Sequence, residues 1–175
     1  MIELIFTKTE YCYQSLVDLG GDDAHIELDT GSPISTISIP NLLQITGESL
    51  FTFRKKVNSF TGSNNPLSLG VYGSQMNSVK HDFIPYLIKK LKIGETKFPY
   101  FLFWVDITSL NSKDMLPTSI LFGFDYIQQG KKWFDDNDDF HISFESITAD
   151  TFSVEYALSN ISDHISEIKS LILMD

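Results

Sequence analysis

Short segments rich in β-branched and aromatic residues recur along this 175-residue chain, and they constrain its fold more than any other feature. Clusters of Gly, Asn, Asp and Ser separate them, as is typical of turns between strands. The strand-type segments are IELIF (2–6), HIELD (25–29), SLFTF (49–53), LSLGVY (67–72), YFLFWVDI (100–107) and FHISF (140–144). Many short strands with frequent turns predict an all-β barrel or sandwich.

The segment from Phe98 to Ile107 is nearly all apolar before Asp106. A strand with one face in solvent alternates apolar and polar residues, whereas a strand covered on both faces has no such alternation. We therefore expect this strand to be buried on both faces.

Two helices are expected among the strands. A short one runs from Phe124 to Gln129 and ends at Gly130, because glycine is favoured after a helix C-terminus. A longer one lies in the tail, where Ile161, Ile165, Ile168 and Ile172 recur at helical spacing after the N-cap candidates Ser159 and Asn160. We expect residues 1–150 to form one domain and residues 151–175 to form an extension packed on it. The alternative is that the tail helix binds a partner.

Composition and charge exclude several classes of protein. The chain has no apolar run of 18 residues and no signal-peptide pattern at its start, so we expect no membrane partner. A single cysteine, Cys12, cannot form an internal disulfide, which favours a cytoplasmic location. The net charge of −10 argues against nucleic acid as a partner, because binding a phosphate backbone needs clustered positive charge.

The common motifs of metal and cofactor sites are absent from the sequence. There is no HExxH, CxxC, G-x-S-x-G or phosphate-binding glycine loop, and the four histidines are scattered. The acidic run 135–139 lacks the spaced ligands and the final glutamate of a calcium loop, which favours a solvated turn. We therefore expect neither a metal nor a cofactor.

Asp29, Thr30, Gly31 and Ser32 follow the strand-type segment that ends at Leu28. One interpretation is an ordinary turn in which the Asp29 side chain bonds nearby backbone groups. The other is that the carboxylate is placed to react. A second stretch, SILFGFDYI (119–127), favours the latter, because it combines apolar residues, Gly123 and an acidic residue before the short helix.

In this order, LDTGS and ILFGFD resemble the two motifs of retropepsin-like aspartic proteases, the retroviral type of aspartyl protease. The resemblance covers about residues 2–146. It implies a retropepsin-like closed barrel, with a short helix after the second motif. It also implies that Asp29, Thr30 and Gly31 are catalytic residues. Gly123 would lie close beneath the active-site loop, where only glycine permits the backbone approach.

The resemblance also implies a glycine-bearing hairpin, the flap, that closes over a bound peptide. We expect its tip at Gly62-Ser63-Asn64-Asn65, and the alternative is Tyr72-Gly73-Ser74. The substrate-binding residues implied in this way are Ser32, Glu27, Gly62, Ser63, Asn64, Tyr72, Gly73 and Gly123.

Only one D-[ST]-G triplet occurs, since VDLGG (17–21) has Leu19 in place of the hydroxyl residue. A pair of catalytic aspartates would therefore require a homodimer in which each subunit supplies Asp29. The resulting hypothesis is a homodimeric aspartic endopeptidase that cleaves peptides or proteins. One alternative is a catalytically inactive module of the same fold that binds peptides or dimerises. Another is an unrelated β-domain in which Asp29 caps a turn.

Three residues depart from the viral pattern of the family. Glu27 replaces an apolar residue at a position that faces the substrate channel, so it either places a charge there or faces solvent. Pro33 and Phe124 replace an aspartate and an arginine that form a pair in viral members. Pro33 also lacks the N–H with which a peptide could be bound. These differences bear on substrate and dimer contacts, while the Asp-Thr-Gly triplet is intact.

Overall fold

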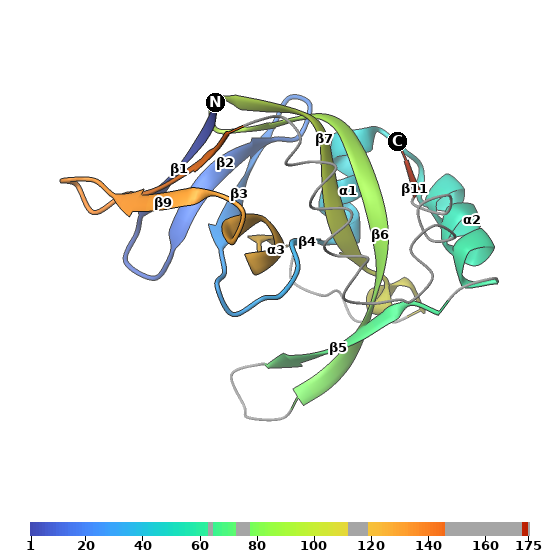
Figure 1. Ribbon diagram of the computed structural model, residues 1–175. Coiled ribbons are helices and arrows are strands. Elements are labelled where there is room, and N and C mark those ends of the chain that lie inside the picture. Colours follow the sequence, from blue (N-terminus) through green and yellow to red (C-terminus); the bar gives the residue numbers. More distant parts are fainter. Residues whose placement is uncertain (63–64, 73–77, 112–118, 146–172, 175) are drawn as a thin grey trace.

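The computed structural model describes residues 1–62, 65–72, 78–111, 119–145 and 173–174. Six strands close into a barrel and helices are few, so the prediction of an all-β retropepsin-like closed barrel is confirmed (Figure 1). The strands are β1 (Ile2–Lys8), β2 (Tyr13–Asp18), β3 (Asp23–Leu28), β4 (Thr36–Ile37), β5 (Leu67–Tyr72), β6 (Ser78–Ile93), β7 (Thr96–Asp106), β8 (Ile120–Phe122), β9 (Lys131–Phe134), β10 (Phe140–Phe144) and β11 (Leu173–Met174). The helices are α1 (Ile39–Thr46), α2 (Leu50–Thr61), α3 (Phe124–Ile127) and a 3-10 turn (Thr108–Asn111).

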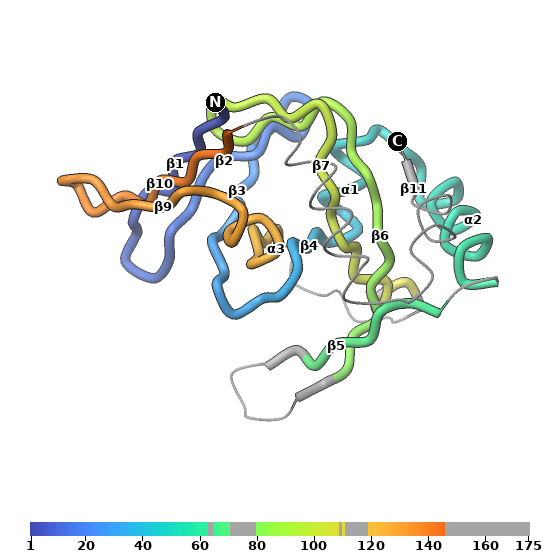
Figure 2. The backbone as a smooth tube through the Cα atoms, in the orientation of Figure 1, coloured from blue at the N-terminus to red at the C-terminus, as the bar shows by residue number. Residues whose placement is uncertain are grey.

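The barrel closes through a ring of neighbouring strands. In order around the ring these are β6, β7, β4, β8, β3 and β2. The seam between β2 and β6 is short: Val17 pairs with Ile93, and the Gly94 N–H donates to the Leu16 carbonyl at 2.7 Å. The β6–β7 hairpin is much longer and turns at Gly94 and Glu95, as the sequence predicts. Its backbone runs across the whole molecule (Figure 2).

Strand β7 passes through the core. Residues 101–105 are all buried, so the prediction of a strand covered on both faces is confirmed for this part, whereas Pro99 and Tyr100 are exposed. Phe101 stacks on Tyr126 with ring centroids 4.1 Å apart and planes 6° apart. The Tyr126 hydroxyl accepts the Leu102 N–H at 2.9 Å, so helix α3 is fixed to β7 by both apolar and polar contacts.

The predicted helix after the second motif is present as α3, but Gly130 does not end it. The C-cap is Gln128, with helical backbone angles. Gly130 is buried instead, because its backbone lies against the side chain of Ile142. A Cβ at Gly130 would lie 2.7 Å from Ile142 Cδ1 and nearer still to Cγ1. The glycine therefore serves packing and not helix termination.

The prediction that SLFTF (49–53) forms a strand is wrong, because this segment begins helix α2. The Ser49 side chain caps the helix by accepting the Thr52 N–H at 3.1 Å. Phe53, Val57 and Phe60 are buried, and their spacing places them on one helical face. Their burial against the core outweighs the strand preference of the aromatic residues in isolation.

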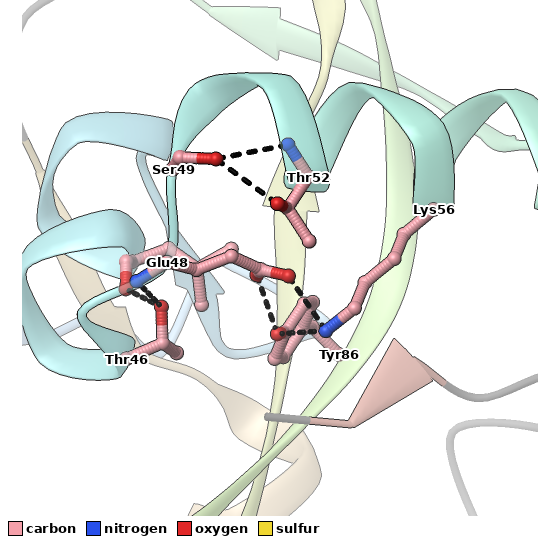
Figure 3. A network of polar contacts seen from close by, with 7 residues as sticks. Thr46, Glu48, Ser49, Thr52, Lys56 and Tyr86 are labelled. Atoms are coloured by element: carbon pink, nitrogen blue, oxygen red, sulfur yellow. Dashed lines mark hydrogen bonds and ion pairs between the residues drawn. The ribbon is translucent and has the colours of Figure 1, made fainter.

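A polar network ties α2 to the barrel (Figure 3). Tyr86 on β6 is fully buried, and its hydroxyl donates to Glu48 Oε2 at 2.8 Å. The Lys56 ammonium donates to the same hydroxyl at 3.0 Å and pairs with Glu48 Oε1 at 2.7 Å. The Glu48 side chain is only 9% exposed, so its charge depends on these two partners.

We expect Tyr86→Phe to lower the free energy of unfolding by about 1–2 kcal/mol, because the substitution removes a hydroxyl that a buried carboxylate uses. Chemical denaturation would measure the loss. Tyr11→Phe is the matched control, since Tyr11 is 89% exposed and should tolerate the same change. Equal stability of Tyr86→Phe and the parent would contradict the importance of the network.

The tail helix predicted around residues 159–172 lies outside the described residues. Within the tail, β11 pairs in parallel with β6, with Leu173 opposite Tyr86. No helix in the described ranges is both long and apolar enough to cross a membrane.

Candidate active site

The loop of residues 29–35 joins β3 to β4 and passes around the end of β8. Strand β8 lies between these two strands: it pairs in parallel with β3 and antiparallel with β4. The Asp29 N–H donates to the Phe122 carbonyl at 3.0 Å, which continues the β3–β8 ladder by one residue. Asp29 is therefore held in strand register at the point where the loop begins.

The Asp29 carboxylate is oriented by the loop itself. Its Oδ1 atom accepts the Gly31 N–H at 2.9 Å and the Ser32 N–H at 3.2 Å. The turn interpretation of the sequence predicts such bonds, and so does the catalytic one. No hydrogen bond joins Oδ2 to any residue that the structure describes. The side chain thus has one fixed oxygen and one that is open to other partners.

Three further bonds fix the loop in place. The Ser32 hydroxyl donates to the Ile34 carbonyl at 2.6 Å, and the Phe124 N–H donates to the Ser32 carbonyl at 2.8 Å. The Trp104 N–H donates to the Ser35 carbonyl at 2.8 Å. The loop is thereby bound to the start of α3 and to the core strand β7.

Gly123 lies directly beneath this loop, as the sequence predicts. A Cβ at position 123 would lie 2.8 Å from the Ser35 nitrogen and closer still to the Ile34 carbonyl. Both are backbone groups, which cannot move aside as a side chain can. Two backbones therefore touch here, and only glycine allows it.

We expect Gly123→Ala to destabilise the fold by about 3 kcal/mol, because the methyl group would push the 29–35 loop away from β8. Gly130→Ala is the comparison variant, since its new Cβ first meets the side chain of Ile142 and not the backbone, and should cost less. Thermal unfolding of both variants measures the difference. An alanine tolerated better at 123 than at 130 would contradict the close approach.

A buried polar link under the loop was not anticipated from the sequence. The Ser35 hydroxyl accepts the Gly123 N–H at 2.9 Å and donates to Asp125 Oδ1 at 2.8 Å. Both side chains are fully buried. The available signal was the acidic residue two positions after Gly123, together with a small hydroxyl residue six positions after Asp29. This hydroxyl adds a buried side-chain link to the backbone bonds that join the loop to the second motif.

Burial raises the pKa of the Asp125 carboxyl from 3.8 to about 6, although the hydrogen bonds from Ser35 and the Tyr126 N–H oppose the rise. The Oδ2 atom has no hydrogen-bond partner, so ionisation leaves charge on an unsolvated oxygen. The folded protein therefore holds this proton more tightly than the unfolded chain does.

The sign of the pH dependence follows from the raised pKa. Between about pH 4 and pH 6 the folded state binds more protons than the unfolded state, so stability falls as the pH rises. The full effect is of the order of 3 kcal/mol. We expect Asp125→Asn to remove this slope, and urea unfolding at a series of pH values would measure it. A slope that persists unchanged in the variant would assign the effect to other groups.

The remaining predicted site residues fall into three groups. Thr30, Gly31 and Glu27 are exposed and Ser32 is half-buried, all close to Asp29 in the chain. Tyr72 ends strand β5, whose pairing with β6 reaches Ser78. Ser63, Asn64 and Gly73 lie outside the described residues.

The preferred flap tip at 62–65 is wrong as a hairpin turn. Gly62 is the C-cap of α2, with its N–H donating to the Asn58 carbonyl. A hairpin is formed instead by β5 and β6; of the alternative tip, Tyr72 ends β5, whereas Gly73 and Ser74 lie outside the described residues. The first preference fails because α2 was taken for a strand. Figure 1 shows the β5–β6 hairpin extending beyond the barrel at the end where the 29–35 loop lies.

The acidic run 135–139 forms the β9–β10 turn. Asp135 Oδ1 accepts the Asn137 and Asp139 N–H groups at 2.9 and 3.0 Å, so this carboxylate is engaged by its own turn. Among the described residues, no group of three or more His, Cys, Asp or Glu side chains is arranged to hold a metal ion.

Comparisons with known proteins assign no activity to this chain. No family model matches the sequence, and no curated protein matches it significantly. Among solved structures, the chain is similar to the crystal structure of a retropepsin-like aspartic protease from Rickettsia conorii, with a TM-score of 0.46 and 14% sequence identity. The match covers 81% of this chain and 91% of that chain. It assigns no residue role, so the site rests on the geometry given above.

Proposed function

We propose that this chain is a homodimeric aspartic endopeptidase whose two Asp29 carboxylates, one per subunit, activate water for peptide hydrolysis. The observation that carries the proposal is the contact of Gly123 with the backbone of Ile34 and Ser35, in the loop that begins with Asp29-Thr30-Gly31. A turn in which an aspartate only caps the backbone does not require a glycine, such as Gly123, packed directly beneath it. The presence of both the Asp29 loop and Gly123 is explained if the loop must hold the Asp29 carboxylate in a fixed position.

The orientation of Asp29 supports this role. Oδ1 accepts two backbone N–H groups, which fix the carboxylate plane. A base that acts on water needs a second oxygen facing the substrate side, and Oδ2 has no partner among the described residues.

A second carboxylate completes the chemistry. As in aspartic proteases generally, two aspartates at close range resist double ionisation and share one proton. The ionised member takes a proton from water, and the protonated member donates to the carbonyl oxygen of the scissile bond. The apparent pKa values then belong to the pair.

The second aspartate would come from a second copy of the chain, because the sequence has one D-[ST]-G triplet. Thr30 and Gly31 are exposed in the single chain, as expected for residues that a partner subunit covers. The β5–β6 hairpin, in which Tyr72 is the last residue of β5, would close over the bound peptide as the flap.

We expect Asp29→Asn to abolish peptide cleavage while leaving the fold intact, because the amide cannot accept the proton from water. Cleavage of a mixed peptide library, followed by mass spectrometry, measures activity, and circular dichroism checks the fold. Asp136→Asn is the matched control, an exposed aspartate in the β9–β10 turn. Full activity in Asp29→Asn would rule out the proposed mechanism.

The second candidate is a catalytically inactive module that binds peptides or dimerises through the same fold. It is favoured by Pro33 and Phe124, both exposed beside the site. Pro33 offers no N–H to a peptide, and Phe124 is 44% exposed. This candidate predicts peptide binding without cleavage at any pH. Binding of pepstatin, which mimics the transition state, that is lost in Asp29→Asn would favour the enzyme.

A further inference from the structure

Strand β3 places Glu27 on the same face as Asp29. Side chains two residues apart in a strand point to one side, and their Cα atoms are about 7 Å apart. The burial pattern confirms the alternation: Ile26 is fully buried, whereas Glu27 is exposed. Since Asp29 continues the β3–β8 ladder, this relation holds up to the candidate active site.

The Glu27 carboxylate makes no hydrogen bond or ion pair with any residue that the structure describes. Other charged side chains do have partners, such as Lys8 with Asp138 and His141 with Glu3. His25, the next residue on the same face, is exposed and makes no ion pair with Glu27 within the described chain. Glu27 is therefore a charge that is available to a ligand.

Leu121 on β8 is the register partner of Glu27. Its neighbours Ile120 and Phe122 are buried in the core, whereas Leu121 is only partly covered, so it faces the same side as Glu27. The two side chains together form an apolar surface with a carboxylate at its edge. This surface adjoins Asp29, because Phe122, the next residue on β8, accepts the Asp29 N–H.

We propose that Glu27 and Leu121 select a lysine or arginine next to the scissile bond of the substrate. A basic side chain has an apolar stem and a charged head, so its stem would cover Leu121 while its head pairs with Glu27. A wholly apolar side chain would leave the carboxylate desolvated and unpaired. An acidic side chain would be repelled.

The charge of the whole molecule acts in the same direction. With 23 acidic and 13 basic residues, the protein attracts cationic peptides over longer distances. The inference rests on the proposed peptidase function, and in the homodimer each subunit would supply one such surface. Basic residues are therefore expected on either side of the bond that is cleaved.

The test uses the full-length protein and a peptide set that varies only in the residues beside the scissile bond: Lys, Arg, norleucine or Glu. We expect the parent to cleave the Lys and Arg peptides at least tenfold faster, as kcat/KM, than the norleucine peptide. Glu27→Gln should lower kcat/KM for the basic peptides about tenfold and should raise it for the norleucine peptide, because a neutral amide is less costly to cover than an unpaired carboxylate. Glu27→Lys should shift the preference to the Glu peptide.

Two controls separate the possible failures. Glu95→Gln removes an exposed glutamate in the β6–β7 turn, whose side chain is 98% exposed, and should change no preference. Asp29→Asn identifies which cleavage belongs to the proposed site. Asp29-dependent cleavage without a basic preference, or with a preference that Glu27→Gln leaves unchanged, overturns this inference and leaves the peptidase proposal standing. Absence of Asp29-dependent cleavage of every peptide overturns both.

Discussion

The contact between two backbones, at Gly123 and at Ile34–Ser35, is the constraint on which the rest of the candidate site depends. It holds the backbone of the 29–35 loop so close to the end of β8 that no side chain fits between them. The short distance allows two hydrogen bonds between the loop and the second motif. The Phe124 N–H donates to the Ser32 carbonyl, and the Gly123 N–H donates to the Ser35 hydroxyl. The position of the Asp29 carboxylate is thus set by a glycine 94 residues away in the chain.

The second motif also contains a buried group that destabilises the fold when it is ionised. Asp125 is fully buried and one of its oxygens has no partner, so the ionised form is poorly stabilised. Through Ser35 the same carboxylate is bonded to the hydroxyl that holds Gly123. Its protonation state therefore changes the charge directly under the loop, whereas Asp29 in the loop above is only half-buried. The two aspartates thus differ in their access to solvent, although they lie close together in the fold.

The sequence was sufficient for features that short motifs encode. The strand 100–107 was recognisable from its unbroken apolar run, and the approach of Gly123 was predicted from the order of two motifs. Helix α2 was missed because Phe51 and Phe53 alternate as in a strand, while Val57 and Phe60, which complete its buried face, lie beyond that window. The flap assignment failed for the same reason. Ser35 and Asp125 could not be paired, since a contact across 90 residues depends on the tertiary fold.

The barrel seam between β2 and β6 has a consequence for motion in this molecule. Its single register pair is far shorter than the ladder that joins β6 to β7. A closed ring that parts at one place remains a continuous open sheet, so separation there would leave the order β6-β7-β4-β8-β3-β2 intact. Sub-global opening at the seam would then expose the interior to solvent exchange without breaking any pairing around β8. The β2–β6 seam, where the barrel has the fewest hydrogen bonds, is therefore separate from the part of the barrel that holds the Asp29 carboxylate.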